Sequence, residues 1–202
     1  MNVTVFEAIN ITKKYRNTLA LNQVSMSVMQ GDIYGFIGEN GAGKTTMIRL
    51  LTGLAEPTTG KIALFGESNK KLAKQRERIG CIIESPSLYL DMTAYENLEV
   101  QRLQRGIPGK GCIDNALALV GLKDTGKKKA KDFSLGMRQR LALAIALLGN
   151  PEFLVLDEPI NGLDPTGIIE LRNLLKRLNK ERGITILSKN TAIHYEGVKI
   201  NI

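Results

Sequence analysis

Residues 38–46 of the 202-residue chain are Gly38-Glu39-Asn40-Gly41-Ala42-Gly43-Lys44-Thr45-Thr46. This stretch fits the pattern G-x-x-x-x-G-K-[ST], in which backbone N–H groups and a lysine surround phosphate groups. The apolar residues 33–37 before it indicate a buried strand, and residues 45–51 after it indicate a helix. Strand, glycine loop and helix in this order favour a phosphate-binding loop over an ordinary glycine-rich turn. The stretch therefore predicts a nucleoside triphosphate site.

The residue types of this loop each suit a phosphate ligand. Glycines at 38, 41 and 43 are expected to adopt backbone dihedral angles that other residues avoid, so that N–H groups can point inward. The positive end of the following helix adds attraction for the β-phosphate. We expect the Lys44 ammonium to reach the β- and γ-phosphate oxygens, as a catalytic group, and the Thr45 hydroxyl to bind Mg²⁺. The loop residues expected to contact the nucleotide are Gly38, Asn40, Gly41, Gly43, Lys44, Thr45 and Thr46.

A second apolar strand pattern ends in two acidic residues. Residues 153–156 are typical of a strand buried on both faces, and Asp157 and Glu158 follow directly. We expect Asp157 to contact Mg²⁺ through a water, opposite Thr45, and Glu158 to polarise the attacking water as general base. An apolar run that ends in two acids is common by chance, and its pairing with a phosphate loop is what favours catalysis.

The composition is that of a soluble globular protein, with 43% hydrophobic and 24% charged residues. No apolar run approaches the roughly 18 residues of a membrane span, and no signal-peptide pattern opens the chain, so we expect a cytoplasmic protein. Cys81 and Cys112 lack metal-ligand spacing and indicate reduced thiols.

The net charge of +8 is compatible with binding to nucleic acid, with binding to an anionic membrane surface, or with solubility alone. The lysine-rich residues 127–131 lack interleaved aromatics and indicate a solvated loop.

The order of strand and helix patterns predicts an α/β fold with a mostly parallel core sheet and an N-terminal antiparallel β region. No strand pattern occurs between residues 91 and 149, where Thr93 is the expected cap of a helical stretch. We therefore predict one domain over residues 1–202. Its α/β core would cover about residues 1–84 and 150–202, and a helical subdomain would be inserted at about residues 85–149.

Two further residues have both a functional and an ordinary interpretation. Glu84 follows the predicted strand 79–83, and a strand end in an open α/β sheet faces the ligand crevice, although an isolated carboxylate is more often plain surface. Ser134 is a natural N-cap of the next helix, and a helix N-terminus with a hydroxyl and a nearby Gly136 also binds anions. Capping alone explains Ser134 equally well.

Taken together, the motifs resemble those of the ATP-binding subunits of ABC transporters, from the start of the chain to about Leu187. After the phosphate loop, the family's motifs follow in its order and spacing as FSLGMRQR at 133–140, FLVLDEP at 153–159 and INGLDP at 160–165. The sequence is most similar to the subgroup for bacitracin and lantibiotic export and self-protection. In that subgroup Ser-Leu-Gly-Met replaces the usual Ser-Gly-Gly-Gln, and Glu84 replaces the glutamine of the loop that joins the two subdomains.

The resemblance implies a P-loop NTPase fold of ABC type and roles for individual residues. Tyr15 would stack on adenine, and Glu84 would ligate Mg²⁺. Ser134 and Gly136 would bind the γ-phosphate of an ATP held by a second subunit, identical or different, with Asp164 at that interface. Two ATP molecules would then lie between two chains.

The resemblance also implies a partner and a location. The stretch from Ser85 to about Ala130 would dock a separate transmembrane permease, which would place the chain at the inner face of the cell membrane. No direct nucleic-acid partner is expected.

The sequence departs from the family's pattern near its C-terminus. The family places a switch histidine shortly after the last core strand, here residues 184–187, and the spacing points to Thr191. The only histidine, His194, lies in a stretch that resembles a later strand of the family, as if the intervening segment were absent. Truncation, an unusual natural sequence or omitted residues each account for this pattern.

Three functions fit these observations. The first is a transport ATPase that hydrolyses ATP to ADP and phosphate and powers export of a substrate such as bacitracin or a lantibiotic. The second is a nucleotide-binding module with impaired hydrolysis, and the third is a soluble ABC-type ATPase acting on the ribosome or DNA. The single cassette, without a coiled-coil insertion or long linker, argues against the third. We predict the first.

Overall fold

The computed structural model describes residues 3–39, 41–83, 87–189 and 199–201. The expectations for Asn40, Glu84, Thr191 and His194 lie outside these residues. The strands are β1 (Thr4–Tyr15), β2 (Thr18–Met29), β3 (Ile33–Phe36), β4 (Thr59–Leu64), β5 (Glu67–Ser68), β6 (Ile79–Ile82), β7 (Phe153–Asp157), β8 (Thr185–Lys189) and β9 (Lys199–Asn201). The α-helices are α1 (Lys44–Thr52), α2 (Leu72–Arg76), α3 (Ala94–Gln104), α4 (Gly111–Leu119), α5 (Leu135–Leu147) and α6 (Pro165–Arg182). Short 3₁₀ turns cover Asn69–Lys71, Lys123–Thr125 and Ala130–Asp132.

A five-stranded sheet in the order β6-β7-β8-β3-β9 forms the centre of the molecule, and every paired strand in it is parallel. The carboxyl ends of its strands therefore lie at one edge, where ligands bind in open α/β sheets. In the register of this sheet, Lys189 at the end of β8 lies beside Asp157 of β7 on one side and Phe36 of β3 on the other. The predicted parallel core is confirmed.

Strand β7 is buried on both faces, as its apolar sequence predicts. Phe153 and Val155 belong to a hydrophobic cluster with α1 and strands β1, β2 and β4, whereas Leu154 and Leu156 belong to a cluster with α3 to α6. This alternation follows from the two-residue period of a strand. It fixes which way Asp157 points at the end of β7, where that side chain is only 4% exposed.

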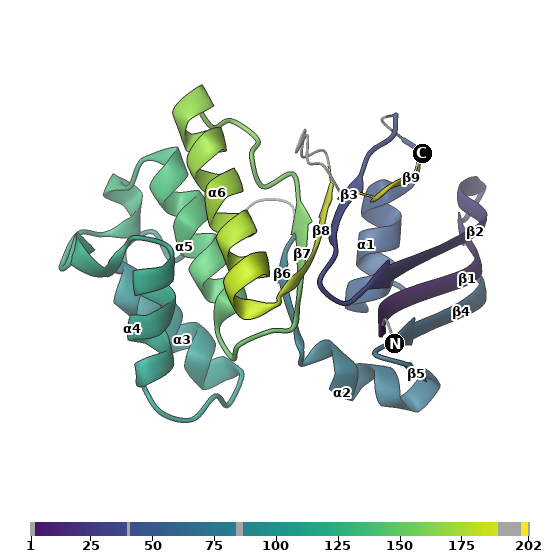
Figure 1. The fold of residues 1–202 in the computed structure, drawn as a ribbon, viewed down its shortest axis with the longest axis horizontal. Coiled ribbons are helices and arrows are strands. Elements are labelled where there is room, and N and C mark those ends of the chain that lie inside the picture. Colours follow the sequence, from purple (N-terminus) through teal and green to yellow (C-terminus); the bar gives the residue numbers. More distant parts are fainter. Residues whose placement is uncertain (1–2, 40, 84–86, 190–198, 202) are drawn as a thin grey trace.

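An antiparallel sheet in the order β2-β1-β4-β5 covers one side of the core and confirms the predicted N-terminal antiparallel region. Figure 1 shows α1 between this sheet and the parallel sheet, with α3 to α6 on the opposite side. The buried residues of α1 that pack into the cluster with the antiparallel sheet are Met47, Ile48, Leu50 and Leu51. The phosphate loop and α1 are thus anchored between two sheets.

Residues 91–149, all of which the structure describes, are helices and loops with a single isolated β-bridge between Thr93 and Lys129. Thr93 caps α3 as predicted, since its hydroxyl accepts from the Glu96 N–H and the Glu96 carboxylate accepts from the Thr93 N–H. This start of α3 is therefore fixed by local sequence.

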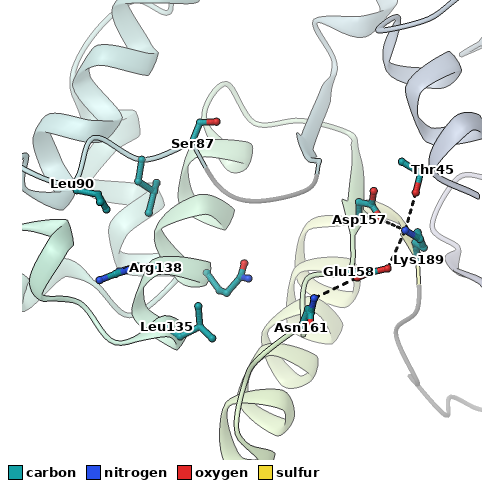
Figure 2. Close-up of a pocket in the computed structure, with 11 residues that line it drawn as sticks. Thr45, Ser87, Leu90, Leu135, Arg138, Asp157, Glu158, Asn161 and Lys189 are labelled. Atoms are coloured by element: carbon teal, nitrogen blue, oxygen red, sulfur yellow. Dashed lines mark hydrogen bonds and ion pairs between the residues drawn. The ribbon is translucent and has the colours of Figure 1, made fainter.

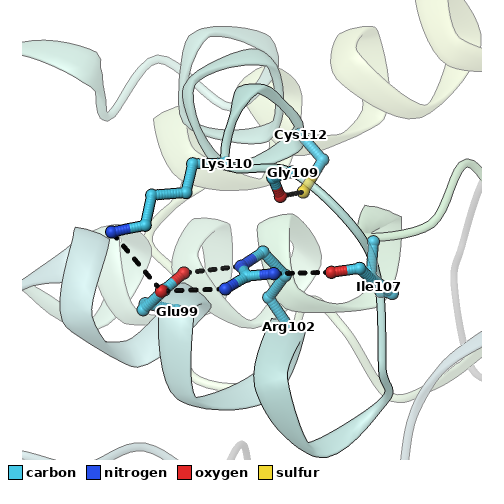
Figure 3. A network of polar contacts seen from close by, with 6 residues as sticks. All are labelled: Glu99, Arg102, Ile107, Gly109, Lys110 and Cys112. Carbon is cyan, nitrogen blue, oxygen red and sulfur yellow. Dashed lines mark hydrogen bonds and ion pairs between the residues drawn. The ribbon is translucent and has the colours of Figure 1, made fainter.

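The loop between α3 and α4 is held by an ion-pair network (Figure 3). The Arg102 guanidinium donates to both carboxylate oxygens of Glu99, at 2.6 and 2.9 Å, and to the Ile107 carbonyl oxygen at 2.6 Å. The Lys110 ammonium lies 3.8 Å from the same carboxylate. The hydrogen bond from Arg102 is the main reason that the pKa of the Glu99 carboxyl lies below its usual value. The network ties the turn at residues 105–110 to α3.

The four helices α3 to α6 share one hydrophobic cluster with the parallel sheet, so the helical region does not pack around a core of its own. The predicted boundaries of a helical subdomain near residues 84 and 149 remain a prediction. Cys81 and Cys112 do not form a disulfide with each other. Among the described helices, none combines the length and apolar character needed to cross a membrane.

Gly80 of β6 provides a test of the packing between the sheet and α5. A Cβ there would overlap the Ala146 carbonyl oxygen and approach Leu154 Cδ2 within 2.9 Å. We expect Gly80→Ala to lower the free energy of unfolding by roughly 1–3 kcal/mol, because backbone must move to admit the methyl group. Urea unfolding measures this change.

The matched control is Gly111→Ala at the start of α4, where nothing lies within 4 Å of an added Cβ. That change should stay within about 0.5 kcal/mol of the parent. Equal effects of the two substitutions would contradict the assigned packing.

Candidate nucleotide site

The phosphate loop joins β3 to α1, and α1 begins at Lys44. Gly43 is the N-cap residue with φ of 83°, and Gly41 has φ of 90°. A Cβ on Gly43 would lie 2.5 Å from both the Ala20 carbonyl oxygen and Leu21 Cδ2, so this position requires glycine for space as well as for φ. The expectation was wrong at Gly38, whose φ is not in the positive region and whose added Cβ would make only ordinary contacts.

The Lys44 side chain is folded into the loop, and the residue is only 5% exposed. Its ammonium donates to the carbonyl oxygens of Gly38 and Glu39, the latter at 2.6 Å. The first backbone N–H groups of α1, at Lys44, Thr45 and Thr46, have no acceptor within the helix. The loop thus combines a buried positive charge with a helix N-terminus, which is the chemistry of an anion site.

Asp157 and Glu158 lie at the carboxyl end of β7, as predicted. Asp157 is 4% exposed, and the Glu158 side chain is 36% exposed. Glu158 has φ of 51°, a left-handed conformation that costs a non-glycine residue on the order of 1 kcal/mol. Such strain persists where surrounding structure enforces it and is common at functional sites.

Lys189, which no sequence motif singles out, lies at the centre of this site. The Lys189 ammonium donates to Thr45 Oγ1 at 2.8 Å and lies 2.9 Å from Asp157 Oδ1 and 3.0 Å from Glu158 Oε1 (Figure 2). Burial alone would lower the pKa of Lys189, but the two carboxylates outweigh burial and raise it above its usual value. The ammonium is therefore charged.

The oxygen atoms around Lys189 fit a divalent cation. Thr45 Oγ1 and Asp157 Oδ1 converge on one small volume, and oxygen ligands of this kind suit Mg²⁺. Asp157 Oδ1 is buried and, within the described part of the chain, lies 2.9 Å from the Lys189 ammonium as an ion pair without a hydrogen bond of its own. Within the described residues, no group of three His, Cys, Asp or Glu side chains could hold a metal, so an ion here would rely on the Thr45 hydroxyl as well as on Asp157.

Thr45, Asp157, Glu158 and Lys189 line one wall of a cleft of about 690 Å³. Figure 2 shows Leu135 and Arg138 of α5 on the other wall, with their side chains separated from the acidic pair by open space. The size suits a small polar ligand.

A second cavity of about 430 Å³ lies on the other side of the first turn of α5, since Leu135 and Gln139 line both cavities. Ser134, Gly136 and Asp164 line the second cavity. The Ser134 hydroxyl accepts from the Met137 N–H at 3.2 Å, and the Asp164 carboxylate accepts from the Gly167 N–H at 3.2 Å. Both residues cap their own helices, and within one chain they do not join Thr45 and Asp157.

Tyr15 lies at the end of β1, 41% exposed, with the Lys13 ammonium 4.8 Å from its ring centroid. Because Gly43 packs against Ala20 and Leu21 of β2, the β1–β2 hairpin that carries Tyr15 lies beside the phosphate loop. Stacking of Tyr15 on a base remains a prediction.

The model for the ABC transporter family matches residues 21–161, which include the phosphate loop and the Asp157–Glu158 pair. The chain belongs to the ABC transporter family. This confirms the resemblance inferred from the sequence motifs.

Individual ABC transporter proteins are also similar to this chain in sequence or structure. The bacitracin transport ATP-binding protein BcrA of Bacillus licheniformis is 50% identical over 184 residues, which cover 91% of this chain and 60% of BcrA. The lantibiotic transport ATP-binding protein SrtF of Streptococcus pyogenes is 43% identical over 178 residues, covering 88% and 76% of the two chains. The ATP-binding cassette MJ0796, solved as a post-hydrolysis dimer bound to ADP and Pi, superposes with a TM-score of 0.79 at 27% identity, covering 93% and 88%.

The chain thus spans about three fifths of the length of BcrA. The expected similarity to bacitracin and lantibiotic transport proteins is confirmed at the level of sequence. The sequence pattern predicts a last strand that ends at Leu187, whereas β8 continues to Lys189. The residues that Lys189 contacts follow from the position of β8 between β7 and β3, which the sequence pattern does not give.

Lys44 provides a test of the phosphate loop. We expect Lys44→Met to weaken ATP binding by roughly 10- to 100-fold, since a hydrogen bond to a charged group contributes about 1.5–3 kcal/mol. Equilibrium titration with a fluorescent ATP analogue measures the affinity. The control is Lys61→Met on β4, which removes an exposed lysine and should leave the affinity unchanged. Equal affinities of Lys44→Met and the parent chain would exclude this loop as the nucleotide site.

Proposed function

We propose that this chain is the ATP-binding and ATP-hydrolysing subunit of an ABC transporter. The convergence of Thr45, Asp157 and Glu158 beside the phosphate loop is the observation that supports this function most strongly. A binding loop alone would suit any nucleotide-binding protein. An adjacent carboxylate pair, one buried and one facing the cleft, adds the groups that hydrolysis requires.

In the proposed reaction, the Lys44 ammonium and the N-terminus of α1 bind the β- and γ-phosphates. Thr45 and Asp157 would hold Mg²⁺, directly or through a water, and the ion when bound supplies positive charge against the phosphate oxygens. The Glu158 carboxylate accepts a proton from water as the water oxygen attacks the γ-phosphorus. The bond from the γ-phosphorus to the bridging oxygen breaks, and ADP leaves with that electron pair.

Within one chain, Ser134, Gly136 and Asp164 lie in a different cavity from the phosphate loop. We propose that they act on an ATP bound by a second subunit, so that the site is completed across a dimer. The dimeric MJ0796 cassette supports this arrangement by its similar fold. The second subunit would be a copy of this chain or a related cassette.

We further propose that the subunit works with a separate transmembrane permease at the inner face of the cell membrane. The exported substrate would be an antimicrobial peptide of the bacitracin or lantibiotic type, on the basis of the names of BcrA and SrtF. The helices of residues 87–130 would dock the permease.

The alternative of a nucleotide-binding module with impaired hydrolysis is favoured by one contact. Glu158 Oε1 is paired with the Lys189 ammonium at 3.0 Å, so that this oxygen is directed to the ammonium and not to an attacking water. Hydrolysis therefore requires that this ion pair open.

Substitution of Glu158 distinguishes the hydrolysing subunit from the nucleotide-binding module. We expect Glu158→Gln to lower the rate of steady-state ATP hydrolysis at least about 100-fold, because an amide cannot accept the proton. Binding of ATP should remain, since Lys44 and the loop are unchanged. The control is Glu181→Gln, which makes the same chemical change at an exposed position near the end of α6.

Hydrolysis by the parent chain and by Glu181→Gln but not by Glu158→Gln is the expected pattern. ATP binding with no hydrolysis in any of the three proteins would instead support the nucleotide-binding module. Hydrolysis by Glu158→Gln at the parent rate would contradict the role of Glu158.

A further inference from the structure

We propose that Lys189 competes with the divalent cation of the nucleotide site, so that Mg²⁺ and ATP must displace its ammonium before the catalytic arrangement forms. This inference rests on the proposed function, because it concerns the same site. It assigns to Lys189 a role in setting how strongly nucleotide binding depends on Mg²⁺.

The position of Lys189 follows from the topology of the sheet. Strand β8 lies between β3, which leads into the phosphate loop, and β7, which ends at Asp157. The last residue of β8 therefore lies between the loop and the acidic pair. A lysine there has its charge directed to the site by the backbone register and not by a mobile surface loop.

The contacts of Lys189 are those of an enclosed cation. Its side chain is 13% exposed, and its ammonium has one hydroxyl and two carboxylate oxygens at 2.8 to 3.0 Å. Exposed ion pairs contribute little to stability because water screens them, but the partner carboxylate of Asp157 is 4% exposed. The ammonium therefore compensates charge that water does not reach well.

An ammonium and Mg²⁺ cannot both occupy this volume. An ion bound to both Thr45 Oγ1 and Asp157 Oδ1, at about 2.1 Å from each, would lie between two oxygens that the Lys189 nitrogen now contacts at 2.8 and 2.9 Å. The two positive charges would repel each other in that volume. The four-carbon stem of a lysine is flexible, so the ammonium can leave while the backbone of β8 stays in place.

Two consequences follow from this competition. Without Mg²⁺, Lys189 lessens the repulsion between the carboxylates and the phosphates of ATP. With Mg²⁺, part of the binding free energy is used to break the contacts of Lys189. Both effects reduce the factor by which Mg²⁺ tightens ATP binding, and departure of the ammonium also releases Glu158 to act on water.

The experiment measures this factor with a fluorescent ATP analogue. The factor is the dissociation constant in EDTA divided by the dissociation constant in millimolar Mg²⁺. We expect the ratio to be about tenfold larger in Lys189→Met than in the parent chain. The control is Lys71→Met, which removes one positive charge from an exposed ion pair with Glu67 and should leave the ratio unchanged. A ratio in Lys189→Met that is unchanged or smaller, or an equal rise in Lys71→Met, would overturn the proposal.

A second measurement does not require nucleotide. Millimolar Mg²⁺ alone should raise the melting temperature of Lys189→Met by about 2–4 °C more than that of the parent chain, because the ion binds the uncompensated carboxylates. If Lys189→Met does not fold, Lys189→Gln replaces it in both measurements with the same expected direction. Absence of nucleotide binding in every protein would refute the proposed function, while the melting temperatures would still decide the competition. An equal effect of Mg²⁺ on the melting temperatures of Lys189→Met and the parent chain would overturn the proposed competition.

Discussion

The parallel register of β3, β7 and β8 is the constraint on which the site depends. Because these strands run in the same direction and are adjacent, their carboxyl ends deliver the phosphate loop, the acidic pair and Lys189 to one edge of the sheet. The hydrophobic residues of β7, directed alternately to two clusters, hold this register in place. The chemistry of the site is thus a consequence of strand order.

Charge compensation is the second condition that the site must satisfy. A buried aspartate and a neighbouring glutamate at a strand end require a nearby positive charge, since an unpaired buried charge is costly. Lys44 is engaged by the carbonyl oxygens of its own loop, whereas Lys189 contacts both acids. Exchange of this internal cation for Mg²⁺ with ATP would link nucleotide arrival to release of the general base.

The sequence was sufficient for the features that depend on local patterns. The glycine loop, the buried strand ending in Asp157 and Glu158, and the caps at Thr93 and Ser134 could be predicted because each has its own residue signature. Gly38 was assigned an unusual backbone that only Gly41 and Gly43 adopt, since a motif does not state which glycine needs positive φ. Lys189 could not be placed, because its partners are distant in sequence and meet it through strand order. The separation of Ser134 from the phosphate loop is likewise a property of the packed chain.

The most direct test of this account is a crystal structure of the chain with Mn²⁺ and a non-hydrolysable ATP analogue. We expect the phosphates on residues 38–46, anomalous density about 2.2 Å from Thr45 Oγ1 and bound to Asp157 directly or through one water, and the Lys189 ammonium displaced from between them. An analogue bound elsewhere, or a metal site remote from Thr45, would contradict the assignment of this edge of the sheet as the nucleotide site.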